Sequence, residues 1–462
     1  MFVGLLKFVY MASKYRVLDG AFRERGSRIW RYCYSFLAGV FYPKRFFTRW
    51  CPDHHAHNLL SFCALLGPIY IKFGQTLSTR PDIIRAENAL ILKSLQDDLT
   101  PVSFDLIQET LNQELGGDLN EIFSYIDPSP VASASVAQVH KAVLRSGQHV
   151  AVKVLRPNIH NDYTKSLKSL KIVAKCIAWI FADIEKFKLP EVIEIFHASM
   201  SQELNLKLEA ANCSELQDNL AKIKVQSGAG GVVLPCVYWQ FTTQKVLVSS
   251  WISGVSVYHE EGLGAIDRKD VSYRLANMFF HQTYQDGFFH ADLHPGNILI
   301  LPNGQIALVD FGIMGRLSDR DRLGVAQILY CLLKRDYLGA ARAHLNAGYV
   351  PESTDLALFA QHCRAVCEPI VGLALKDVSI GNVLGQMLSV IKAFDIQVQP
   401  QLILLQKSML VIEGVGNTLN PDINMWQLAY SWMENWGIKN LSIEARMLAR
   451  FKKFIAKEIF KI

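Results

Sequence analysis

The chain is 462 residues long, half of its residues are hydrophobic, and its formal net charge is +6. This length and apolar content exclude a disordered protein and are sufficient for two lobes with extensions. Nine cysteines without a Cys-x-x-Cys pair indicate a reducing compartment and buried thiols, not a disulfide framework. No apolar run reaches the roughly 18 residues that a membrane-spanning helix needs, and the best candidate, 172–182, predicts a buried helix.

Basic residues are concentrated at the start of the chain. Residues 1–50 contain ten Lys and Arg against Asp19 and Glu24, so the remainder is slightly acidic. Hydrophobic side chains between these charges predict an interfacial helix that meets anionic lipid. Met1–Met11 lacks a small-residue cleavage site, so we expect no secretory signal. The alternative is a helix that packs on the body with its charges in water.

The N-terminal region, residues 1–125, is predicted to be mainly helical. Its most specific feature is Lys72-Phe73-Gly74-Gln75, on an amphipathic helix that begins after Pro68. Lys72, Gln75 and Thr79 share one face of this helix because they are three to four residues apart. A solvated helix face would explain this pattern without any function.

Residues 126–255 predict a small lobe of strands, one of them near Val232, with helices at 161–182 and 190–220. Its start contains a loop of small residues where a typical kinase has Gly-x-Gly-x-x-Gly over the nucleotide. The first residues of this loop are Ala132, Ser133, Ala134 and Ser135. Small side chains can still cover a nucleotide, but alanine and serine restrict the backbone, so we expect a different fit.

The strand Val150–Leu155 is apolar apart from Lys153. A single lysine in such a strand is typical of kinases, where it bridges the nucleotide phosphates and a helix glutamate. The candidate partners are Glu203 and Glu209, on a predicted helix at 196–216, and we favour Glu209. A solvated edge lysine is the alternative, but the order of motifs along the chain favours a function.

The predicted catalytic loop runs from His290 to Asn297 and contains Asp292, and Asp310-Phe311-Gly312 follows 13 residues after Asn297. Apolar runs between them predict two strands joined by Pro-Asn-Gly, a strong hairpin signal. The hairpin would bring Asn297 and Asp310 to one end, where two oxygen ligands can share a magnesium ion. Asp292 would then face the phosphoryl acceptor or a water molecule. Asp-Phe-Gly alone could be a simple turn, but both motifs with a hairpin between them favour a nucleotide site.

This hairpin lies in a predicted helical large lobe, residues 256–430. No Ala-Pro-Glu follows Gly312, and a helix is predicted to begin near Ser318, so we expect no docking platform for protein substrates. Residues 431–462 predict a basic amphipathic tail that binds a membrane or packs on the body. Its apolar stripe is Leu448, Phe451, Ile455, Ile459 and Ile462.

From about residue 20 to 430, these motifs resemble the UbiB family of atypical protein-kinase-like proteins. The Lys-x-Gly-Gln helix at Lys72, the alanine-rich loop, the acidic motif at Glu203 and the catalytic loop carry the resemblance. It implies an α+β, bilobal protein-kinase-like fold with a helical N-terminal extension and a helical C-terminal lobe. It also implies that ATP and Mg²⁺ are cofactors, and that ATPase activity is better supported than protein phosphorylation.

The resemblance also assigns roles to individual residues. Lys72 and Gln75 would fold over the active site and block protein substrates, and Lys153 would contact the nucleotide phosphates. The catalytic-loop aspartate would be Asp292, and the metal ligands would be Asn297 and Asp310.

Two departures from the family pattern concern other positions. Glu203-Leu204-Asn205 ends in asparagine where aspartate is usual, so a charge expected to pair with Lys72 is missing. Ser249-Ser250-Trp251 lacks the usual acidic residue of the hinge-like strand.

We therefore expect a membrane-associated kinase or ATPase that supports ubiquinone or other prenyl quinone biosynthesis, with no nucleic-acid partner. The expected partners are ATP, a membrane lipid or quinone precursor, and other quinone-biosynthesis proteins. The expected location is peripheral, on the cytoplasmic face of a bacterial inner membrane or on a mitochondrial inner membrane. The alternatives are a small-molecule or lipid phosphotransferase and a nucleotide-gated lipid-binding scaffold without catalysis.

Overall fold

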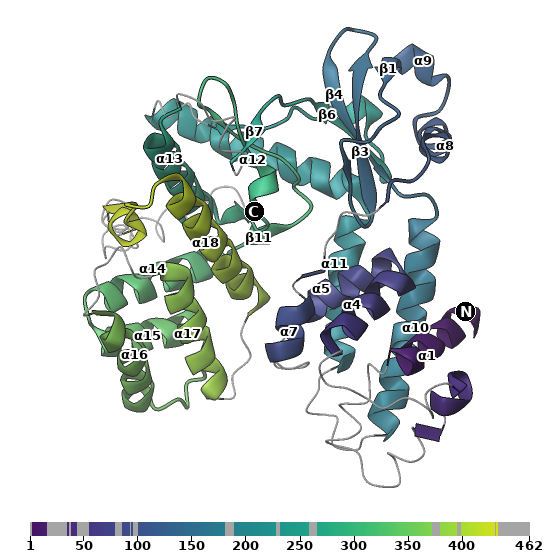
Figure 1. Cartoon of the computed structure of the whole chain (residues 1–462). Helices are drawn as coiled ribbons and strands as arrows, with labels where there is room; N and C mark the ends of the chain where they lie inside the picture. Colours follow the sequence, from purple (N-terminus) through teal and green to yellow (C-terminus); the bar gives the residue numbers. More distant parts are fainter. Residues whose placement is uncertain are drawn as a thin grey trace, which may run out of the picture. The chain divides into compact units, whose positions relative to one another are not determined.

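A computed structural model gives the fold of the chain (Figure 1). It describes residues 2–15, 35–36, 38–43, 55–78, 86–92, 94–95, 100–180, 189–227, 232–257, 266–371, 379–394, 399–429 and 431–432. Most of the basic N-terminal residues and the apolar stripe of the predicted C-terminal tail lie outside these residues. The chain divides into two compact units: residues 1–210 with 236–251 form the first unit, and residues 211–235 with 252–462 form the second unit.

The first unit contains a five-stranded antiparallel sheet in the order β1-β3-β4-β6, with β2 paired to β3. The strands are β1 (Phe123–Ile126), β2 (Ala132–Ser133), β3 (Ala137–Leu144), β4 (His149–Leu155) and β6 (Val246–Ser250). Alternate residues of a strand point to opposite faces. Val150, Val152 and Val154 are therefore buried together, against α8 (Phe104–Leu115), whereas Lys153 lies on the other face.

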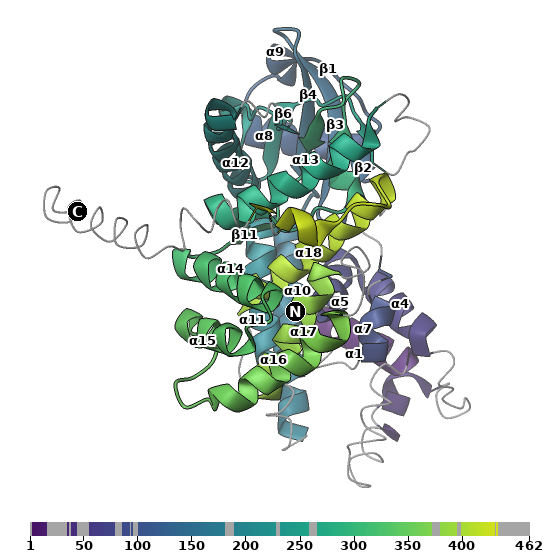
Figure 2. The same cartoon turned by 90° about the vertical axis from the view of Figure 1, so that its left-hand side faces the viewer.

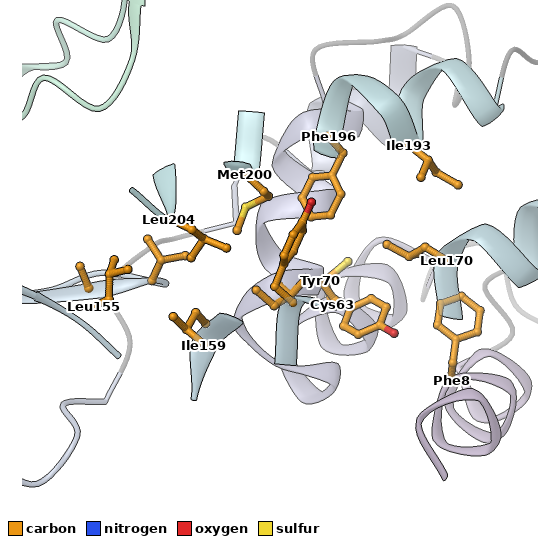
Figure 3. Close-up of a cluster of buried hydrophobic side chains, with 14 of the residues drawn as sticks. Phe8, Cys63, Tyr70, Leu155, Ile159, Leu170, Ile193, Phe196, Met200 and Leu204 are labelled. Carbon is orange, nitrogen blue, oxygen red and sulfur yellow. The ribbon is translucent and has the colours of Figure 1, made fainter. Parts of the chain in front are cut away.

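Most of the other described residues of the first unit lie in helices (Figure 1). They are α1 (Phe2–Lys14), α4 (His55–Leu66), α5 (Pro68–Ser78), α7 (Ala86–Leu92), α8, α9 (Leu119–Ile122), α10 (Ile159–Ile180) and α11 (Leu189–Glu203). A cluster of aromatic and aliphatic side chains joins several of them, and Figure 3 shows Tyr70 of α5 and Phe196 of α11 within it. The predicted amphipathic Lys-x-Gly-Gln helix is thus α5, and it buries its apolar face here.

The predicted helix at 190–220 is wrong in one respect, because the structure has two helices there. The first, α11, ends at Glu203, and α12 (Leu206–Ser227) begins three residues later. The Oδ1 atom of Asn205 accepts a hydrogen bond from the backbone N–H of Lys207 at 3.2 Å, as an N-cap residue does. The cap starts a new helix and allows a change of direction between two good helix-forming segments.

The second unit contains a four-stranded sheet in the order β5-β10-β9-β7 and a two-stranded β8-β11 ladder. The strands are β5 (Val232–Val233), β7 (Val255–Ser256), β8 (Phe288–His290), β9 (Ile298–Ile300), β10 (Ile306–Leu308) and β11 (Met314–Arg316). The strand near Val232, which we predicted in the small lobe, instead pairs in parallel with β10. This pairing is long-range, so local sequence could not indicate it.

In the sequence, helices of the second unit lie between these strands and after the last of them (Figures 1 and 2). They are α13 (Arg268–Phe280), the π-helix η6 (His281–Asp286), α14 (Asp319–Leu333), α15 (Tyr337–Ala347), α16 (Leu356–Val371), α17 (Ile380–Ala393) and α18 (Pro400–Leu419). As predicted, a helix follows Ser318, which caps α14 together with Asp321. Helices and mainly antiparallel sheets together confirm the α+β class.

One described helix, α18, is long and apolar enough to cross a membrane, with half of its apolar window buried within the structure. Our expectation that no segment reaches this length was therefore wrong for 400–419. Lys407 and Glu413 interrupt the apolar run, although its mean hydropathy remains high. Because α18 packs against α13 and α17, its burial is that of a core helix.

Candidate active site

The β9–β10 hairpin places two predicted metal ligands at one end. Ile306 pairs with Ile300 and Leu308 with Ile298, so Asn297 immediately precedes the ladder and Asp310 follows Val309 just beyond it. The backbone N–H of Val309 donates to the carbonyl of Asn297 at 3.1 Å, which closes this end. At the opposite end the predicted turn has Gly304 at φ 77°, a left-handed conformation that favours glycine.

The catalytic loop is tied together by hydrogen bonds between the predicted residues themselves. The Asn297 Nδ2 atom donates to the backbone carbonyl of Asp292 at 3.0 Å. Asn297 is buried, whereas the Asp292 side chain is 30% exposed. The amide thus fixes the backbone beneath Asp292 and keeps its own Oδ1 atom as a possible cation ligand.

His290 is buried beneath this loop and connects it to the strand before Asp310. Its Nδ1 atom accepts from the backbone N–H of Asp292 at 3.1 Å, and its Nε2 atom faces the carbonyl of Val309 at 3.3 Å. These partners require the neutral Nε2–H tautomer. Burial lowers the pKa of His290, which further favours the neutral ring.

Asp310 has an unusual backbone. Its φ is 62°, a left-handed conformation that aspartate tolerates better than most residues. Its Oδ1 atom accepts from the N–H of Gly312 at 3.3 Å, and its side chain is exposed at the hairpin end. The next residue, Phe311, is buried with its ring 5.6 Å from that of His290, so the Asp-Phe-Gly turn packs on the catalytic loop.

A residue that the sequence interpretation missed lies beside Asp292. The Nζ atom of Lys407, on α18, is 2.8 Å from Asp292 Oδ1. The two residues are 115 positions apart, so no local pattern could connect them. The available signal was that Lys407 is the single basic residue of 400–419, in a helix of high mean hydropathy.

In the first unit, the structure separates the two candidate glutamates by their partners. Lys153 Nζ lies 2.8 Å and 2.9 Å from the two carboxylate oxygens of Glu209. Glu203 instead forms an ion pair with Lys72, at 3.4 Å. Lys72 therefore has a carboxylate partner although position 205 is asparagine, where the resemblance led us to expect aspartate.

The remaining Lys-x-Gly-Gln residues have structural contacts. The Gln75 side chain donates to the carbonyl of Leu95 at 3.1 Å. A Cβ atom at Gly74 would lie 2.6 Å from the Leu95 side chain, so glycine permits this close approach. The motif thus fixes α5 against the segment that follows α7.

The loop of small residues is held by an arginine from the end of β4. Ala132 and Ser133 form β2, and Ala134 N–H donates to the Ala137 carbonyl at 2.9 Å. Arg156 donates to the carbonyl of Ala134 and to the hydroxyl of Ser133, each at 2.9 Å. The loop is therefore anchored at its base, and Ser135 is buried.

Ser250 lies in the hinge-like strand, the second place where the sequence departs from the expected pattern. It forms two hydrogen bonds with Cys236. Its hydroxyl accepts from Cys236 N–H at 2.9 Å, and its own N–H donates to the Cys236 carbonyl at 2.8 Å. The Ser250 hydroxyl thus stabilises the backbone of this strand, at the position where the resemblance led us to expect an acidic residue.

These features define a protein of the kinase-like class: a strand lysine paired with a helix glutamate, and a His-to-Asn loop and an Asp-Phe-Gly turn around a hairpin. The chain belongs to the ABC1 atypical kinase-like family, because the profile of the ABC1 atypical kinase-like domain matches residues 94–344. The profile of the UbiB helical domain matches residues 363–424. The predicted UbiB resemblance and kinase-like fold are thereby confirmed.

Among solved structures, the chain is similar to Rv3197 from Mycobacterium tuberculosis, whose structure was determined as a complex with erythromycin. The sequence identity is 23% and the TM-score is 0.48. The similarity covers 82% of this chain and 95% of that chain.

Proposed function

We propose that this protein is a membrane-associated atypical kinase or ATPase that binds Mg-ATP and supports ubiquinone or other prenyl quinone biosynthesis. The observation that carries the proposal is the single hydrogen-bonded group formed by Asp292, Asn297 and the hairpin that leads to Asp310. A hairpin with a purely structural role would not need an exposed carboxylate on a residue with positive φ, as Asp310 has.

The residues at the hairpin end are suitable for a magnesium nucleotide. Asn297 Oδ1 and the Asp310 carboxylate are hard oxygen ligands, which Mg²⁺ prefers alongside phosphate oxygens. Bound Mg²⁺ would neutralise charge on the nucleotide phosphates. Asp292 would orient the attacking hydroxyl or water and accept its proton, while His290 and Asn297 hold the loop backbone.

In the first unit, Lys153 would contact the phosphates and Glu209 would orient its ammonium group. Lys153 is 18% exposed and Glu209 only 7% exposed, so the pair is shielded from bulk water and keeps a defined geometry. Ala132, Ser133, Ala134 and Ser135 would cover the nucleotide. Lys72 and Gln75 would limit access of protein substrates.

Membership in the family supports the quinone part of the proposal. The membrane part is supported by α1, on which Leu6 is 39% exposed and Tyr10 is 41% exposed, next to Lys7. Exposed apolar side chains flanked by lysine are typical of helices that lie at a lipid surface.

Phosphate release from ATP by the full-length protein tests the proposal. We expect magnesium-dependent turnover that rises with anionic vesicles or a phenolic quinone precursor. Asp310→Asn should lower the turnover number at least about 100-fold through loss of a charged metal ligand. Asparagine also tolerates the left-handed backbone, so the variant should fold. The matched control is Asp218→Asn, at an exposed position on α12, which should leave turnover unchanged.

Complementation of a deletion strain tests the biological role. Quinone levels in a deletion strain should be restored by the wild-type protein and not by Asp310→Asn. Turnover that survives Asp310→Asn would contradict the enzymatic part. Phosphate transferred to an added hydroxyl compound would favour a small-molecule or lipid phosphotransferase. Nucleotide binding without hydrolysis, with complementation surviving Asp292→Ala, would favour a scaffold.

A further inference from the structure

The contact between Lys407 and Asp292 joins the UbiB helical domain to the catalytic loop. We propose that Lys407 is a positioning residue: helix α18 supplies the cation that orients the Asp292 carboxylate for the reaction. This inference rests on the proposed function. It assigns to α18 a part in the chemistry in addition to its packing.

The catalytic loop itself contains no lysine or arginine, and the buried His290 ring bonds to the backbone of Asp292. Two positions after Asp292 the loop carries His294, whose Nδ1 atom accepts the N–H of Gly296 at 3.1 Å. That bond caps the short helix at Pro295–Asn297, so the ring has a structural role in the turn. Among the described residues, Lys407 forms the ion pair with Asp292.

Packing and hydrogen bonds fix the position of α18, the helix that carries Lys407. Its buried face includes Leu405, Met409 and Ile412, which follow helical spacing. At its far end Glu413 accepts hydrogen bonds from the backbone N–H groups of Ile380 and Gly381, at the start of α17. A helix N-terminus favours a negative charge, so this contact fixes the position of α18 along α17.

Close packing between α17 and α18 fixes the same position. A Cβ atom at Gly381 would lie 2.6 Å from Leu410 Cγ, and one at Gly385 would lie 2.4 Å from the amide nitrogen of the Gln406 side chain. Glycines one turn apart thus allow the residues on either side of Lys407 to approach α17. The lysine therefore projects from a rigid backbone toward Asp292.

Stability does not explain this pair. The Lys407 side chain is 49% exposed and that of Asp292 is 30% exposed, and exposed ion pairs add little to the stability of a fold. Beside a reacting carboxylate, a cation has a different effect. It holds the carboxylate in one orientation toward the attacking hydroxyl or water.

Steady-state kinetics of the full-length protein test the role. Lys407→Met should lower kcat by about 10- to 100-fold and change the KM for ATP by less than about threefold, because the effect lies in the reacting geometry. Lys407→Arg should recover most of the lost rate, since it restores the positive charge. Lys269→Met, at an exposed position on α13, is the control and should leave kcat unchanged.

A double-mutant cycle separates positioning from a general loss of structure. If Lys407 acts through Asp292, Lys407→Met should cost less than about threefold in an Asp292→Asn background. An equal loss in both backgrounds would overturn the proposal, as would wild-type kcat in Lys407→Met. Turnover that requires Asp310 but not Lys407 would overturn this role alone. A wild-type protein without turnover would overturn the proposed function and this role together.

Amine labelling followed by mass spectrometry gives a readout that needs no nucleotide. The ion pair shields the Lys407 ammonium, so Asp292→Asn should increase its labelling rate by about twofold or more. The labelling rate of Lys269 should not change. An unchanged Lys407 rate would show that the two side chains are not paired in solution and would overturn the proposal.

Discussion

Both carboxylate oxygens of Glu209 accept hydrogen bonds from the ammonium group of Lys153, at 2.8 and 2.9 Å. Lys153 comes from the middle of β4, and Glu209 comes from the first turn of α12. The pair thus fixes the start of α12 against the sheet of the first unit. It also leaves the lysine on the face opposite the buried valines of β4.

Removing the lysine should therefore destabilise the protein. Lys153→Met removes the ammonium group that both carboxylate oxygens of the buried Glu209 accept from, and we expect a loss on the order of 3 kcal/mol in the free energy of unfolding. Urea denaturation measures this loss. The control is Lys171→Met, because Lys171 pairs with Glu194 at the surface, where the side chains are 42% and 61% exposed. Similar shifts in the denaturation midpoint for both variants would contradict the argument.

Asn205 should be replaceable by aspartate, the residue that the UbiB resemblance led us to expect at this position. Asn205→Asp retains the oxygen that accepts the N–H of Lys207 and adds negative charge at the N-terminus of α12. We expect a gain of about 0.3–1 kcal/mol in stability, measured by thermal unfolding at low salt. The gain should disappear in high salt, where the interaction is screened. A destabilised variant would argue against a capping role.

Two glycines on facing helices should respond oppositely to alanine. Gly381→Ala places a methyl group 2.9 Å from the backbone nitrogen of Leu410, and this overlap should cost about 1–3 kcal/mol. Gly414 is exposed on α18 with nothing within 4 Å of an added Cβ, so Gly414→Ala should stabilise the helix by about 0.5–1 kcal/mol. Denaturation curves measure both. Gly381→Ala should also lower kcat, because it displaces the helix that carries Lys407.

The protein should lose stability in acid because its His344 side chain is buried. Burial lowers its pKa to about 4 from 6.5, although a hydrogen bond to the Ala340 carbonyl opposes the shift. The folded state thus favours the neutral ring, while the unfolded chain binds a proton near pH 6.5. Stability from this group is fully present above pH 6.5 and is lost as the pH falls toward 4, up to about 3 kcal/mol.

The measurement compares unfolding free energies at pH 7.5 and pH 5. His344→Leu should lose less stability between these values than the wild type, because leucine has no proton to bind. His362→Leu, on α16, is the matched control and should retain the wild-type difference. Identical pH dependence in all three proteins would show that His344 does not titrate on unfolding.

The part of the site that could be predicted is the part encoded locally. The Pro-Asn-Gly turn and the apolar runs beside it specify the hairpin, and the hairpin brings Asn297 and Asp310 to one end. Strand alternation likewise separated Lys153 from the buried face of β4. Short-range rules were sufficient for these elements because each depends on neighbours within a few residues.

The features that were missed depend on distant partners or on one capping side chain. The pairing of β5 with β10 and the approach of Lys407 to Asp292 join segments far apart in sequence. The break at Asn205 lies between two runs of helix-forming residues, so their periodicity concealed it. Its signal was the asparagine itself, a strong N-cap residue.

Lys407 lies in the segment that matches the UbiB helical domain and Asp292 in the segment that matches the ABC1 domain, so their ion pair joins the two segments. A gene fusion that paired this ABC1 domain with an unrelated C-terminal domain would lose the lysine that faces its aspartate. We therefore expect the two segments to be inherited together. Substitutions at either position should be accompanied, across descendants, by compensating changes at the other.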